Sequence, residues 1–170
     1  RVANDVANIP TPIVEGNQVF VTTGYGTGAA LLELAPDGDG GVEAREVWFL
    51  DGNELQNHHG GVVLHEGVLY TGTGHNRGYP IAVRMADGET LWGPVRNEGQ
   101  GSAAVTYADG HLYLRYQSGI MILAEATPTG YVQKGSFPIP DAAQFSWSHP
   151  VIANGRLYLR EQNHLLAYDV

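Results

Sequence analysis

The sequence predicts an all-β protein made of four successive units of short antiparallel strands. The prediction begins with a short pattern that occurs four times: a two-residue turn, then an alternating strand with Phe or Tyr three residues after the turn. The copies are aligned on their second turn residue and are separated by 50, 43 and 45 residues, at Asn17, Gly67, Gly110 and Gly155. A period in the forties that contains only strands is typical of β-propeller blades.

The turn residues support this alignment. A two-residue type I′ hairpin requires positive φ at both central positions, which favours Asn-Gly and Asp-Gly. Asn154-Gly155 and Asp109-Gly110 fit directly, and Glu66-Gly67 keeps the glycine. Gly16-Asn17 reverses the order and uses the other residue type that tolerates the left-handed region. We therefore expect four hairpins in the same register within their repeats.

A second pair of strands follows each hairpin except the last. In the second unit, an Asp-Gly turn at residues 86–89 separates two apolar runs, as expected for strand, turn and strand. The expected strands are 30–34 and 45–49, 81–85 and 90–92, 119–123 and 131–133, and 164–168 alone in the fourth unit. The expected blades of this single domain are residues 9–51, 58–97, 99–140 and 146–170, four strands each, the last one strand short.

The aromatic residue of the repeat predicts how neighbouring blades pack. Because side chains alternate along a strand, the aromatic side chain and its aliphatic neighbours point to opposite faces of the blade. Both faces are expected to be largely covered, because each blade lies between two others. The four aromatic residues at this position are Phe20, Tyr70, Tyr113 and Tyr158.

Composition agrees with an all-β fold and excludes several classes of function. The chain has 23 Gly and 9 Pro among 170 residues, which suits many tight turns, and no segment of useful length has the helical 3.6-residue period. Nine basic against 18 acidic residues give a net charge of −9, so we expect no nucleic-acid partner. No apolar run is long enough to predict a membrane span. The absence of cysteine excludes disulfides and thiolate metal sites.

The repeat endings resemble those of quinoprotein-type propellers. Residues 85–92 combine an aspartate, a glycine turn and a closing Trp92, and Trp48 matches this ending less completely. Longer phrases resemble the PQQ-like propeller proteins of bacteria, at residues 9–12, 24–28, 57–61, 125–128 and 148–151. The resemblance covers essentially the whole chain, as the carboxy-terminal half of such a propeller. It implies a periplasmic or extracellular protein whose full ring has seven or eight blades.

The same resemblance does not imply a bound cofactor. Many members of the PQQ-like family carry the fold without PQQ, and the family includes an outer-membrane assembly lipoprotein whose propeller is a protein-binding scaffold. Members that are dehydrogenases hold Ca²⁺ with carboxylate and amide oxygens, and they use an aspartate base and often a vicinal cysteine pair. This chain has no cysteine, and its nearest carboxylate to the expected rim is Glu54. PQQ with Ca²⁺ is therefore not supported by the residues present.

Residues that enter the first strand of each blade are expected to gather at one rim of the central channel. These candidate ligand-binding residues are Asn57, His58, His59, Gln100, Ser102, Trp147 and His149. The three imidazoles could ligate a transition metal, and the indole could stack on a flat ligand. In the alternative interpretation, these polar groups only hydrogen-bond the backbone at strand ends and channel water.

The residues favour a binding module over an enzyme. A Ser-His-Asp set can be chosen from Ser102, His59 and Asp51, but Ser102 lacks the context of a nucleophile elbow. The first hypothesis is a non-catalytic propeller module that binds a protein partner or a small ligand at its channel rim. The second is the carboxy-terminal part of a PQQ-dependent oxidoreductase.

The sequence also raises the question of how the ring closes. The chain begins at Arg1 without an initiator Met, and the fourth unit ends at Val170 before an outer strand. We therefore expect a processed or excised piece of a protein. Four blades could close as a tight ring, pair with a second copy into an eight-bladed ring, or belong to a longer parent chain. The last two alternatives are favoured, because blades of this type suit wider rings.

Overall fold

The computed structural model describes residues 1–170 as fifteen strands without a helix, which confirms the all-β prediction. The strands form four antiparallel sheets, each with its strands in chain order. Blade 1 is β1 (Ile13–Glu15), β2 (Gln18–Thr23), β3 (Gly28–Pro36) and β4 (Val42–Asp51). Blade 2 is β5 (Val62–His65), β6 (Val68–Thr73), β7 (Tyr79–Arg84) and β8 (Thr90–Trp92). Blade 3 is β9 (Ala103–Ala108), β10 (His111–Tyr116), β11 (Ile120–Glu125) and β12 (Gln133–Pro138), and blade 4 is β13 (Val151–Ala153), β14 (Arg156–Glu161) and β15 (His164–Asp169).

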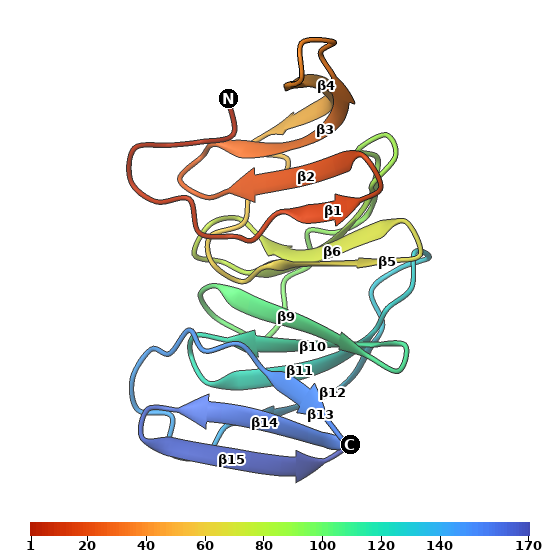
Figure 1. Cartoon of the computed structure of the whole chain (residues 1–170). Coiled ribbons are helices and arrows are strands. Elements are labelled where there is room, and N and C mark those ends of the chain that lie inside the picture. The colour runs from red at the N-terminus through yellow and green to blue at the C-terminus, as the bar shows by residue number, and fades with distance from the viewer.

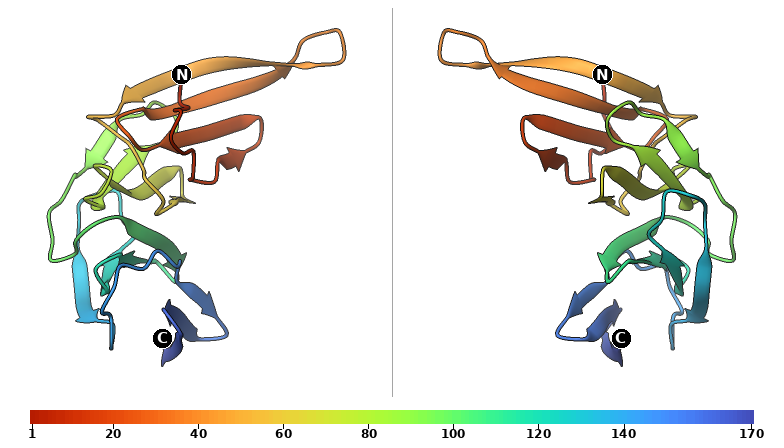
Figure 2. Two further views of the ribbon diagram at one scale, coloured as in Figure 1. Left: turned by 90° about the vertical axis from the view of Figure 1, so that its left-hand side faces the viewer. Right: turned by 90° about the vertical axis from the view of Figure 1, so that its right-hand side faces the viewer.

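The four blades follow one another along a curved, open arc (Figures 1 and 2). Blades 1 and 4 lie at its two ends, and each has one face without a neighbouring blade. The links between blades and the loops between the second and third strands lie at one end of the sheets, as the strand registers require. We call this end the connection rim; its segments are residues 24–27, 52–61, 74–78, 93–102, 117–119, 139–150 and 162–163.

The hairpin turns at the opposite end follow the sequence prediction in three blades. Both central residues have positive φ at Glu66-Gly67, Asp109-Gly110 and Asn154-Gly155. In blade 1 only Gly16 has a positive φ, 59°, and Asn17 does not. This turn is therefore of the II′ kind, which requires glycine at its first position and leaves the second residue unrestrained in this respect.

The outer strand of blade 3 lies later in the chain than expected. Residues 131–133 were predicted, but β12 runs over Gln133–Pro138 and pairs with β11. Instead of joining the ladder, the Tyr131 ring packs near the Trp92 ring of blade 2, with centroids 5.7 Å apart. The hydrophobic contact between blades thus outweighs the β-propensity of Tyr131.

Alternation along the second strand of each blade determines which neighbour a side chain meets. Phe20 on β2 is buried in one cluster with Leu69 and Ile81 of blade 2. Tyr70 on β6 packs with Leu112 of blade 3 in the next cluster. The aromatic residue therefore faces the following blade, and the aliphatic neighbours face the preceding one.

This rule explains where the predicted burial holds and where it fails. Leu112 and Leu157 are 1% and 2% exposed, as expected for residues between blades. Tyr158, by contrast, faces the open side of blade 4 and is only half-buried. The expectation that both faces are covered is therefore right for blades 2 and 3 and wrong at the two ends of the arc.

The tryptophans that close the first two repeats each bind the neighbouring blade. Trp48 Nε1 donates to the carbonyl oxygen of Met85 at 2.8 Å, and Trp92 Nε1 donates to that of Thr127 at 2.7 Å. The Trp48 ring also lies against Gly88, where a Cβ atom would be 2.9 Å from the ring. The Asp87-Gly88 turn of blade 2 is thus the docking point for the closing tryptophan of blade 1.

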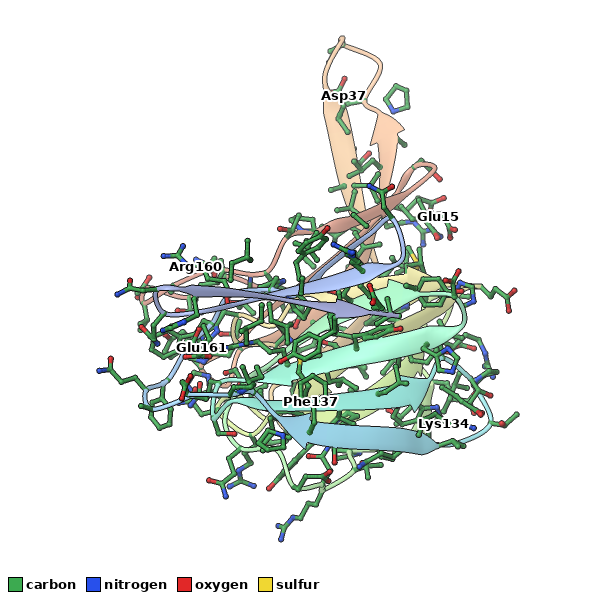
Figure 3. The ribbon with its side chains drawn as sticks, turned by 90° about the horizontal axis from the view of Figure 1, so that it is seen from below. Glu15, Asp37, Lys134, Phe137, Arg160 and Glu161 are labelled. Atoms are coloured by element: carbon green, nitrogen blue, oxygen red, sulfur yellow. The ribbon has the colours of Figure 1, made fainter.

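The hairpin of β3 and β4 is longer than the others and projects beyond the arc (Figure 2). Asp37 lies at its tip in the view from below (Figure 3), where its Oδ1 accepts from the amides of Asp39 and Gly41 at 2.9 Å. The chain contains no helix that is long and apolar enough to cross a membrane.

Candidate functional site

Three histidines from two loops of the connection rim lie ring to ring. His58 and His59 belong to the link between blades 1 and 2, and His75 belongs to the β6–β7 loop. The His58 ring centroid is 4.0 Å from that of His59 and 4.0 Å from that of His75. Because His58 and His59 are adjacent in sequence, the link must turn sharply to place both rings on the same surface.

Aromatic side chains from two further loops extend this group. The Tyr25 ring, from the β2–β3 loop, lies 4.6 Å from the His75 ring, centroid to centroid. The Trp147 ring, from the link between blades 3 and 4, meets the His59 ring edge to face at 5.5 Å. Tyr25 and Trp147 are 40% and 53% exposed. We call Tyr25, His58, His59, His75 and Trp147 the rim cluster.

Hydrogen bonds hold the central imidazole in a neutral form. His58 Nε2 lies 3.1 Å from the Tyr25 hydroxyl, and His58 Nδ1 lies 3.1 Å from the Ser102 hydroxyl. A consistent assignment has Tyr25 donating to Nε2 and Nδ1–H donating to Ser102, whose own proton goes to the carbonyl of His75. The backbone amide of Tyr25 donates to His75 Nδ1 at 3.2 Å, so the neutral His75 ring carries its proton on Nε2.

The environment of the cluster disfavours positive charge on His58 and His59. Burial lowers the pKa of His59 to about 4, with further lowering from the neighbouring His58, His149 and His75. Burial also lowers the pKa of His58, and the nearby His75 acts in the same direction. The His58 and His59 rings are therefore held toward the neutral form, in which they offer aromatic faces and ring N–H groups.

Glycines let the loops of the cluster approach one another. A Cβ atom on Gly24 would lie 2.8 Å from His75 Nδ1 and 3.2 Å from the Cα atom of His58. A Cβ atom on Gly60 would collide with the backbone oxygen of Ala103 in blade 3. The next residue, Gly61, has a φ of 73° and lies against the His149 ring. The Gly-rich phrases around these histidines thus serve close loop packing.

The residues predicted for this rim do not all share one role. His58, His59 and Trp147 lie together in the rim cluster, and His149 joins it through Nε2, which lies 3.0 Å from the carbonyl of His59. Ser102 is beside His58 but only 4% exposed, so its hydroxyl supports the imidazole from below the surface.

Asn57 and Gln100 are placed differently. Asn57 is 1% exposed, and its amide bonds Thr71 Oγ1 at 2.7 Å and the carbonyl of Gly72 at 3.0 Å. It ties the link to β6 and has no surface to offer a ligand. Gln100 is exposed, and its backbone exchanges hydrogen bonds with Ser118, while no contact joins its side chain to the histidines.

Sequence reasoning missed Tyr25 and His75. Both lie in Gly-rich loops, residues 24–28 and 72–78, that occupy the same position in repeats one and two. Their equivalent repeat positions could have revealed them, because the β2–β3 and β6–β7 loops lie at the same rim as the blade links. A search confined to the strand entries could not find them.

The cluster is not arranged as a preformed metal centre. No group of three His, Asp or Glu side chains in the structure is placed to hold a metal ion. The rings of His58, His59 and His75 pack against one another instead of directing their nitrogens to one point. Metal binding by His58, His59 and His149 remains a prediction that would require the rings to turn.

The same residues do not fit a calcium–quinone site. The rim cluster offers imidazole, phenol and indole groups, whereas Ca²⁺ prefers carboxylate and carbonyl oxygens. The two nearest carboxylates in the link serve its own backbone: Glu54 accepts from the amide of Asp51 at 3.0 Å, and Asp51 accepts from that of Asn53 at 2.7 Å. We therefore derive no chemistry through such a group.

No known family model matches the sequence, and no curated protein matches it. Among solved structures, the chain is similar to BamB from Moraxella catarrhalis, with a TM-score of 0.63 at 13% identity over 93% of this chain and 41% of BamB. It is also similar to the computationally designed Ika4 protein, with a TM-score of 0.60 at 9% identity over 100% and 96% of the two chains. A third likeness is to the designed Ika8 protein, with a TM-score of 0.57 at 10% identity over 94% and 57%.

These likenesses establish the class of the protein by its fold. The chain is a β-propeller structure of four blades and spans less than half the length of BamB. At such low identity the comparisons bear on architecture alone.

Proposed function

We propose that this chain is a non-catalytic binding module that docks a protein partner, or a small ligand, on the connection rim. The observation that carries the proposal is the rim cluster, which four separate loops assemble although their residues lie far apart in sequence. Exposed aromatic residues such as Tyr25 and Trp147 are enriched at the centres of protein interfaces. The neutral imidazoles add hydrogen-bonding groups without the cost of burying a charge.

The proposal is tested by comparing capture of partners by two variants of the full chain. His59→Ala/Trp147→Ala removes the most exposed aromatic residue of the rim cluster and the histidine that it contacts, and Val42→Ala alters an exposed residue on the projecting hairpin. Proteins bound by wild type and Val42→Ala, but lost with the rim variant, are purified and titrated by calorimetry. Binding that survives in the rim variant would overturn the proposal.

The alternative function, part of a PQQ-dependent oxidoreductase, has its own measurement. PQQ and Ca²⁺ are added to the chain, and quinone absorption and dye reduction are followed. We expect neither, because the rim lacks a suitable set of oxygen ligands. Dye reduction by wild type would replace the proposal by the alternative.

The open faces of the arc support a second part of the proposal, that further blades cover them. Val151 and Leu165 on blade 4 are 55% and 72% exposed, and Val14 on blade 1 is 66% exposed. Val151 lies opposite Tyr158, which lies opposite Ala167, so the exposed row is apolar across the whole sheet. We propose self-association, or blades of a longer parent chain, as the cover.

We also propose a location outside the cytoplasm, in the periplasm or the extracellular space. The support is the resemblance of the repeat endings to those of PQQ-like propellers, for example at Trp92. Fractionation of the source cells followed by immunoblotting tests it, and recovery of the protein with cytoplasmic markers would contradict it.

A further inference from the structure

Beside the rim cluster, and sharing His75 with it, lies a separate polar cleft of about 630 Å³. Its walls come from the link between blades 1 and 2, the β6–β7 loop and the link between blades 2 and 3. The volume falls in the range of small-molecule sites. The residues that bear on its chemistry are Asn53, His75, Asn76, Arg77, Tyr79 and Arg96.

The cleft collects positive charge that has no counter-ion. Six of the nine Lys and Arg residues form ion pairs with carboxylates: Arg1, Arg45, Arg84, Arg115, Lys134 and Arg156. The three without an ion pair are Arg77, Arg96 and Arg160. Two of these three line the cleft, and no Asp or Glu is among its lining residues. Two arginines without an ion pair in one cleft are unusual in a chain whose net charge is −9.

The two guanidinium groups lie near the same aromatic ring. The Cζ atom of Arg77 is 6.0 Å from the Tyr79 ring centroid, and that of Arg96 is 5.7 Å from it. The ring attracts each cation, but two like charges at one ring repel each other. An anion between them would relieve the repulsion, and the planar guanidinium forks match carboxylate and phosphate oxygens.

We propose that this cleft binds an oxyanion, the carboxylate or phosphate group of a small ligand, through Arg77 and Arg96. His75 carries its proton on Nε2, because its Nδ1 accepts from the Tyr25 amide, so its free nitrogen is a donor. The Asn53 and Asn76 amides add neutral donors at the wall. The site does not depend on partner docking at the rim cluster.

Calorimetric titration of the full chain with inorganic phosphate, and separately with citrate, tests the proposal at low ionic strength. Low salt is needed because both arginines are exposed and therefore screened. The variant is Arg77→Gln/Arg96→Gln, and the matched control is Arg160→Gln, which also removes an arginine that makes no ion pair. Neither cleft arginine makes a side-chain hydrogen bond within the protein, and circular dichroism confirms that each variant is folded.

We expect at least one of the two anions to bind wild type and Arg160→Gln, and to bind the double variant at least about tenfold more weakly. Preference for phosphate or for citrate identifies which oxyanion the cleft favours. The proposal is overturned if neither anion binds wild type, or if Arg160→Gln weakens binding as much as the double variant. Because the rim cluster is unchanged in both variants, partner capture through Trp147 is expected to survive, so the two proposals fail independently.

Discussion

Arg115 on β10 of blade 3 donates to the carboxylate of Glu161 on β14 of blade 4 at 2.5 Å, and both side chains are 1% exposed. Arg115 also donates to the carbonyl of Ser146, while its Nε has no partner. The pair follows the alternation rule: Arg115 is on the forward face of its strand, and Glu161 is on the backward face of the next. This ion pair is buried in an otherwise apolar interface between blades 3 and 4.

Removal of one member of this pair is expected to destabilise the protein strongly. Glu161→Ala leaves the Arg115 charge buried without a counter-ion, which costs about 3–5 kcal/mol in comparable sites. Urea unfolding followed by circular dichroism measures the loss. Arg115→Met/Glu161→Leu removes both charges and is expected to cost less than the single change. Equal stability of Glu161→Ala and wild type would show that the pair contributes nothing.

The pKa of His59 predicts a pH dependence of stability. The pKa is about 4 in the folded protein and about 6.5 in an unfolded chain, so between these values the unfolded state binds more protons. The free energy of unfolding is therefore fully present above about pH 6.5 and falls as the pH is lowered toward 4. Urea unfolding at several pH values measures this slope.

Two variants isolate the contribution of His59. His59→Gln removes the titrating ring, so its stability is expected to fall less between pH 6.5 and 4 than that of wild type. His164→Gln, on the exposed edge strand β15, is the control and should keep the wild-type slope. Parallel curves for His59→Gln and wild type would contradict the assigned environment.

Metal binding by the rim histidines is untested, and their packing leads us to expect that it is weak. Titration of wild type with Zn²⁺ or Cu²⁺ is expected to give little heat, because His58 is bonded on both ring nitrogens and the His58 and His59 rings pack against each other at a tilt of 50°. Calorimetry of wild type and His58→Ala/His59→Ala makes the comparison. Tight binding to wild type that the variant loses would show that the rings reorient around a metal.

The sequence predicted the blades better than the site, for physical reasons. Hairpin turns and strand alternation are local, so the repeat at Gly67, Gly110 and Gly155 revealed the architecture. The rim cluster depends on how loops of different blades pack, and nothing local marks His75 as a neighbour of His58. The prediction for Asn57 was too strong, because the sequence does not reveal that its side-chain amide donates to the Thr71 hydroxyl and to the carbonyl of Gly72.

The ion pair was beyond the reach of sequence reasoning for the same reason. Arg115 and Glu161 are each ordinary strand residues, and only the forward and backward faces of successive blades bring them together. Arg160 has the repeat position of Arg115 but lies on the last blade and makes no ion pair. Figure 3 shows Arg160 beside Glu161, at one end of their strand. We therefore expect that a blade covering this face would carry a carboxylate opposite Arg160.

The open faces lead to the last prediction, which concerns oligomeric state. Soluble proteins rarely leave large apolar patches exposed, so we expect the isolated chain to associate with a second copy through its end blades. Light scattering should give a mass above the 18.3 kDa of one chain. Val151→Lys/Leu165→Lys places charges on the open face of blade 4 and is expected to shift the mass toward the monomer. Val42→Lys, at a residue 67% exposed on the projecting hairpin, is the control and should leave the mass unchanged. A wild-type monomer of 18.3 kDa that melts cooperatively would show that four blades are stable with both end faces open.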